Sequence, residues 1–252
     1  MFARNAPRRD IVGIDLLRFA AALSVLVYHL GHRAWAPPIE EAQIRRMIPD
    51  APAYPELEPV AWLGWVGVEI FFVISGYVIA SSAERASPFA FARSRALRLA
   101  PAIWVCSTIT LGAVALVTGP DSETLKLYAR TLALPFFPKA PWIDSVYWTL
   151  IVELVFYAMI FALLLMDAVR KIGAFAMTLG MVSSTMWFAH AGGLLSGFVD
   201  SWAAHLSLLR HGCFFAAGVL LWLLIVKRVT GLRLAVLLIC VTACLLEISD
   251  LA

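Results

Sequence analysis

Residues 60–80 read VAWLGWVGVEIFFVISGYVIA, an apolar run of 21 residues in which Glu69 is the one charged side chain. A helix that crosses a bilayer needs about 20 mostly apolar residues, so this run predicts a transmembrane helix. We find six more runs of this kind, at roughly 11–30, 98–118, 147–166, 172–190, 204–226 and 232–250. The sequence therefore predicts an all-α polytopic membrane protein, a bundle of about seven transmembrane helices.

The composition of the whole 252-residue chain agrees with this prediction. Hydrophobic residues make up 62%, charged residues 15%, and the mean hydropathy is +0.84. Since a soluble domain of this size cannot bury so much apolar surface in one core, the composition argues against a soluble or disordered protein. The expected partner is the lipid bilayer, and nothing in the sequence separates a second domain, so residues 1–252 are predicted to be a single transmembrane domain.

The basic residues are distributed unevenly between the two sides of the predicted bundle. Twelve Lys and Arg lie in the N-terminal tail and in alternate connecting segments, whereas six lie in the remaining segments. The positive-inside rule then predicts a cytoplasmic N-terminus. Because the net charge of +3 follows this membrane pattern, it does not indicate binding to nucleic acid.

The cysteines do not suggest a metal centre. All four lie inside apolar runs, and Cys240 and Cys244 share one face of a predicted helix. No second pair with metal-ligand spacing accompanies them, so we expect packing residues and no metal.

Charged residues in the first predicted span point to a functional site. An ionised side chain at mid-bilayer costs about 2.5–3.5 kcal/mol on insertion scales. Arg18 and His29 are eleven residues apart, which places both on one helix face about 16 Å apart along the axis, and Asp15 lies one turn before Arg18. Two interpretations remain open: a ligand that runs through the membrane, or an internal ion pair with an interfacial histidine.

A polar stripe runs along the fourth predicted span. Thr149, Glu153 and Tyr157 recur every four residues in an otherwise apolar helix. Such a stripe must face protein or water rather than lipid, and it fits either a reaction cavity or a helix-packing contact. Further ionisable residues inside predicted spans include Glu69, His205, Arg210, His211 and, near the chain end, Glu247.

Residues 91–101, FARSRALRLAP, form a basic segment that we interpret as a cytoplasmic loop. It carries Arg93, Arg95 and Arg98. The segment is either a positive-inside anchor or a phosphate clamp, because guanidinium groups bind phosphate in a bidentate manner.

Taken together and in chain order, these blocks resemble the membrane-bound acyltransferase-3 family, whose members O-acylate surface polysaccharides and related acceptors. Arg18 and His29 are similar to the family's arginine, ten residues, histidine motif. Further similar blocks are Gly67–Tyr77 in the second span, Arg95 and Arg98 followed by Pro101, Trp148–Tyr157, and more weakly Cys213–Gly218.

The resemblance implies an activity and its substrates. It implies transfer of an acyl group, commonly acetyl, from cytoplasmic acyl-CoA to a hydroxyl of a cell-surface or exported carbohydrate. The donor would be acetyl-CoA, no metal is implied, and the location would be the bacterial inner membrane.

The resemblance also implies roles for particular residues. Arg95 and Arg98, with Arg93, would hold the phosphates of CoA, and Arg18, held by Asp15, would position the donor. His29 would act as base toward the acceptor hydroxyl or carry the acyl group, and Glu153 would orient His29 or serve as its partner. Lining the same cavity would be Thr149, Tyr157 and Glu69.

Several features depart from the family pattern or fit other functions. Thr149 stands where many members have Ser, and Ile151 and Leu154 replace polar residues common there. The chain supplies fewer spans than most members, so a truncated, inactive relative is one alternative. A proton-coupled transporter would use the same buried charges, and a seven-helix receptor has only the number of spans in its favour.

Overall fold

The computed structural model describes residues 12–35, 53–119, 121–139, 141–195, 197–227 and 229–250. These ranges contain helices and connecting turns and no strand. Six helical stretches in them are long and apolar enough to cross a membrane, and a shorter apolar helix adds to them, which confirms the predicted all-α membrane bundle. The N-terminal tail with Arg4, Arg8 and Arg9 lies outside the described residues, as does most of residues 31–59, which connect the first two predicted spans. The cytoplasmic N-terminus stays a prediction.

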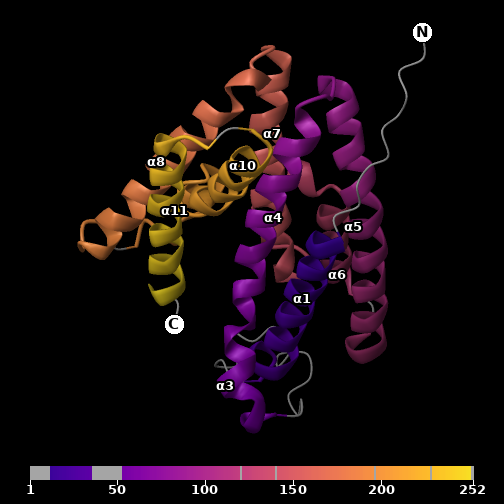
Figure 1. The fold of residues 1–252 in the computed structure, drawn as a ribbon. Helices are drawn as coiled ribbons and strands as arrows, with labels where there is room; N and C mark the ends of the chain where they lie inside the picture. Colours follow the sequence, from indigo (N-terminus) through magenta and orange to yellow (C-terminus); the bar gives the residue numbers. More distant parts are fainter. Residues whose placement is uncertain are drawn as a thin grey trace.

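Two helices form the centre of the bundle, α4 (Val66–Ala83) and α10 (Gly212–Val226). Helix α10 packs against α4, α8 (Ile172–Ala191) and α11 (Gly231–Asp250). Figure 1 shows α8, α10 and α11 on one side of α4 and α1, α5 and α6 on the other. The other helices are α1 (Val12–Tyr28), α3 (Glu58–Ala61), α5 (Pro88–Thr118), α6 (Ser122–Leu132), α7 (Trp148–Leu165) and α9 (Trp202–Leu206), with short 3₁₀ or π turns at His29–Arg33, Pro55–Leu57, Trp62–Trp65, Leu134–Phe136, Ser145–Tyr147 and Val169–Lys171.

Close contact between α4 and α10 depends on two glycines. A Cβ added to Gly76 would overlap the carbonyl oxygen of Phe215, and one added to Gly218 would overlap the carbonyl oxygen of Val73. Small residues at helix interfaces let backbones approach in membranes, where packing rather than hydrophobicity drives association. The two sequence blocks that contain these glycines therefore specify a backbone contact.

Helix α5 begins earlier than the sequence predicted. The segment interpreted as a cytoplasmic loop, residues 91–101, is helical throughout and belongs to the 31-residue helix Pro88–Thr118. Ser87 caps the helix by accepting from the backbone N–H of Ala90, and Pro88 occupies the first turn, a favoured arrangement. The loop assignment was wrong because Arg, Ala and Leu are strong helix formers whatever their charge.

The predicted span 204–226 is broken into two helices. Helix α9 ends at Leu206, Leu208 takes a left-handed φ of 56°, and α10 starts at Gly212. Side chains of α8 satisfy the freed backbone groups: Trp187 Nε1 donates to the carbonyl of Arg210 at 2.9 Å, and Ser183 Oγ donates to the carbonyl of Leu209 at 2.7 Å. Non-helical backbone at membrane depth is tolerated where protein buries it in this way.

Candidate active site

His29 lies where the first helix changes type. The α-helix ends at Tyr28, and His29–Arg33 continue it as a π-turn in which Ala34 N donates to the carbonyl of His29 at 2.9 Å. Such π-turns are rare and occur frequently at functional sites. The Tyr28 and His29 rings pack edge to face, with centroids 5.3 Å apart.

One cavity brings together half of the ten site residues that the sequence predicted. It has a volume of about 320 Å³ and lies between α1, α4, α5 and α7. Five predicted residues line it: Arg18, His29, Arg98, Thr149 and Glu153. We call this space the arginine cavity.

The carboxylate of Glu153 is held by two hydroxyl groups. Ser75 Oγ and Tyr157 Oη each donate to Glu153 Oε1 at 2.5 Å. His29 lines the same cavity but is not among the hydrogen-bond donors to Glu153 in the described part of the chain, so a direct orienting contact stays a prediction. Thr149 bonds to backbone instead, donating from Oγ1 to the carbonyl of Val146 at 3.0 Å.

The predicted donor-binding arginines lie in three environments: the arginine cavity, the exposed surface of α5, and a separate apolar cavity. Arg18 Nη1 is 3.5 Å from Asp15 Oδ1, whereas its Nη2 is buried and finds no hydrogen-bond partner in the ranges that the structure describes. Arg98 lines the same cavity, and Arg93 is exposed on α5. Two guanidinium groups at one cavity favour an anionic ligand.

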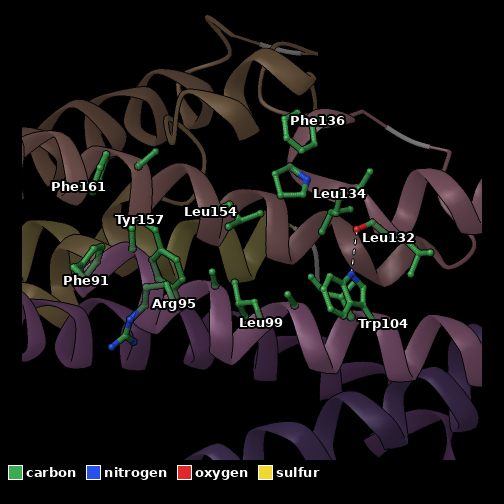
Figure 2. A pocket seen from close by; sticks show the side chains of 17 residues that line it. Phe91, Arg95, Leu99, Trp104, Leu132, Leu134, Phe136, Leu154, Tyr157 and Phe161 are labelled. Atoms are coloured by element: carbon green, nitrogen blue, oxygen red, sulfur yellow. Dashed lines mark hydrogen bonds between the residues drawn. The ribbon is translucent and has the colours of Figure 1, made fainter. Parts of the chain in front are cut away.

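Arg95 lines a different, apolar cavity of about 430 Å³ between α5, α7 and residues 132–136. Figure 2 shows Arg95 at the end near Phe91 and Tyr157, while Trp104 donates to the carbonyl of Leu132 at the other end. The guanidinium carbon of Arg95 lies 5.6 Å and 5.9 Å from the ring centroids of Phe91 and Tyr157. Tyr157 therefore contacts the apolar cavity through its ring and Glu153 through its hydroxyl.

A second polar cavity, of about 450 Å³, adjoins the arginine cavity. His29 and Trp148 line both, so they stand in the wall between them. The side chains that line only the second cavity include Glu69, His205, Arg210 and His211. We call this space the histidine cavity; Glu69 lies here, in a different cavity from Thr149.

Comparison with known proteins identifies the chain's family. The family model described as an acyltransferase domain matches residues 11–249. The chain belongs to the acyltransferase-3 family. It is accordingly a multi-pass membrane acyltransferase. No curated protein and no solved structure matches it.

Several of the sequence blocks that resemble the acyltransferase-3 family meet at one cavity in this structure. The blocks that contain Arg18, His29, Arg98 and Glu153 contribute side chains to the arginine cavity. Sequence reasoning assigned no role to Ser75, although a hydroxyl inside the apolar run 70–80 was the available signal.

Proposed function

We propose that this acyltransferase moves an acetyl group from cytoplasmic acetyl-CoA to a hydroxyl of a cell-surface or exported carbohydrate, across the bacterial inner membrane and with its N-terminus in the cytoplasm. The observation that carries the proposal is the position of His29. It lies in the wall between the arginine cavity, which Arg18 and Arg98 line, and the histidine cavity, which Arg33 and Arg210 line. Donor and acceptor can therefore reach one imidazole from two sides.

The arginines of α1 and α5 support the donor side of the proposal. Arg18 lines the arginine cavity and has a buried N–H group that finds no partner in the described ranges, and Arg98 adds a second cation. Arg93 and Arg95 lie one to two turns earlier on α5, toward its N-terminus. In the proposed orientation these turns are on the cytoplasmic side, where the phosphates of CoA would contact guanidinium groups.

His29 then serves as the base for acyl transfer. Its neutral imidazole takes the proton of the acceptor hydroxyl while the hydroxyl oxygen attacks the thioester carbonyl carbon. The carbon–sulfur bond breaks, and the imidazolium returns the proton to the leaving CoA thiolate. The Glu153 carboxylate, held by Ser75 and Tyr157, supplies a fixed negative charge in the same cavity that favours the imidazolium.

The test uses radiolabelled acetyl-CoA and the protein purified in detergent. We expect wild type to release or transfer the label, His29→Ala to lose at least a hundredfold of this activity, and His190→Ala to keep it. His190 is a suitable control because it pairs with Asp250 at 3.1 Å, on helices that do not line the arginine cavity.

Two results would overturn the proposal. Substantial activity in His29→Ala would remove the base assignment. Intact acetyl-CoA after incubation with folded wild type would contradict acyl transfer from this donor and favour a transport function.

A further inference from the structure

Three ionisable side chains from distant parts of the chain converge in the bundle interior. Glu69 comes from α4, His211 immediately precedes α10, and Glu247 comes from α11. The three residues are 3%, 1% and 0% exposed. Their ligand-type atoms all lie within 4.8 Å of one another.

Each of these side chains has an atom whose hydrogen-bonding capacity is unused. Glu69 Oε2, Glu247 Oε2 and His211 Nδ1 are buried without a hydrogen-bond partner in the described ranges. An unsatisfied buried polar group costs about 1–3 kcal/mol, and more when it is charged. Three such atoms in one cluster indicate a bound group that satisfies them together.

The charges around the cluster indicate that the bound group is a cation. Arg210 Nε donates to Glu247 Oε1 at 3.1 Å, and Arg210 also pairs with Asp200. Because Asp200 is largely exposed, the buried charges are the carboxylates of Glu69 and Glu247 and the guanidinium of Arg210, which with a neutral His211 leaves one negative charge in excess. A bound cation compensates this excess in a medium where unpaired charge is expensive.

We propose that Glu69, His211 and Glu247 bind a divalent metal ion of the zinc class. His211 Nδ1 lies 3.7 Å from the unpartnered Glu69 Oε2 and 3.3 Å from Glu247 Oε1, which also accepts from Arg210 and belongs to the same carboxylate as the unpartnered Oε2. Ligands about 2.0–2.1 Å from a tetrahedral zinc are about 3.4 Å apart, and a mixed imidazole and carboxylate set suits this ion.

The neighbouring histidine supports the same assignment. His211 Nε2 is 3.0 Å from His205 Nδ1. When Nδ1 of His211 binds the metal, Nε2 carries the ring proton and donates a hydrogen bond to Nδ1 of His205. Histidine ligands in metal sites almost always make such a second hydrogen bond, which fixes their tautomer.

Three protein ligands leave one coordination position for water or a ligand. Glu69 and His211 line the histidine cavity, on which His29 also borders. Two of the three proposed ligands would therefore place the ion beside the cavity that would receive an acceptor hydroxyl. The sequence did not reveal this site because its ligands share no local spacing.

Metal content tests the proposal directly. The protein is purified in detergent with a tag that contains no histidine, stripped with a chelator, loaded with Zn²⁺ and freed of excess ion by gel filtration. We expect about one zinc per chain in wild type and in His190→Gln. We expect at least tenfold weaker zinc binding in Glu69→Gln and His211→Gln.

A spectroscopic measurement on wild type keeps the test decisive if a variant fails to fold. Co²⁺ in place of Zn²⁺ gives intense visible absorption bands when it is bound in a tetrahedral site. Either of two results would overturn the proposal. Wild type could retain no zinc and show no such bands, or folded Glu69→Gln and His211→Gln could bind zinc as wild type does. The cluster would then be an ion-pair network without metal.

The metal site and the proposed reaction can fail independently. Glu153→Gln removes a carboxylate from the arginine cavity and leaves all three proposed ligands in place. We expect this variant to bind zinc normally while it loses acyl transfer.

Discussion

Replacing Gly218 by alanine perturbs the contact at the centre of the bundle. The added Cβ would overlap the carbonyl oxygen of Val73 and lie 2.8 Å from the backbone nitrogen of Tyr77. Both obstacles are main-chain atoms of α4 and cannot rotate away as a side chain would. The two helices must therefore separate.

The expected cost follows from this geometry. Inserting a carbon into a well-packed core destabilises by about 1–3 kcal/mol, occasionally more. We expect the upper end of the range, about 3 kcal/mol, because the overlap is with backbone. Activity should fall as well, since α4 also carries Ser75, which donates to Glu153.

Reversible unfolding in mixed micelles, followed by loss of helical circular dichroism, measures this cost. Gly112→Ala is a matched control: Gly112 is also inside a helix, but no atom lies within 4 Å of its added Cβ. We expect the control to be more stable than wild type by about 0.5–1 kcal/mol, because alanine favours a helix interior over glycine. A Gly218→Ala protein as stable as this control would refute the close helix contact.

Three further substitutions test other parts of the structure. Arg18→Lys keeps the charge but loses the planar fork, so the acyl-transfer rate should drop at least tenfold; normal turnover would make Arg18 a structural residue. Tyr157→Phe removes a donor to Glu153 and should lower the free energy of unfolding by about 1.5–3 kcal/mol, whereas unchanged stability would argue against this hydrogen bond. Lys227→Met breaks the ion pair with Glu84; the Lys227 side chain is 45% exposed and the Glu84 side chain 33%. It should cost less than about 1 kcal/mol in the same unfolding assay, and a larger loss would mean that the pair is shielded from water.

Much of the membrane architecture was predictable because hydropathy is a local property. Long apolar runs with isolated charges allow few structures other than spanning helices, and the described ranges contain such helices. Most of the charged residues that line the two polar cavities were also visible as costly exceptions inside these runs; Arg33 and Arg98 were not. Two errors concerned helix ends: the start of α5 depends on the cap at Ser87, and the break after Leu206 depends on hydrogen bonds from α8.

The sequence by itself determined that the chain is a helical membrane protein, and its motifs resembled the family to which it belongs. Only the tertiary structure decided which charges meet. Arg95 and Arg98 are three residues apart on one helix, yet they line different cavities, because neighbouring helices cover different strips of α5. The convergence of Glu69, His211 and Glu247 depends on how α4, α10 and α11 pack. No local periodicity encodes contacts between residues so far apart in the chain.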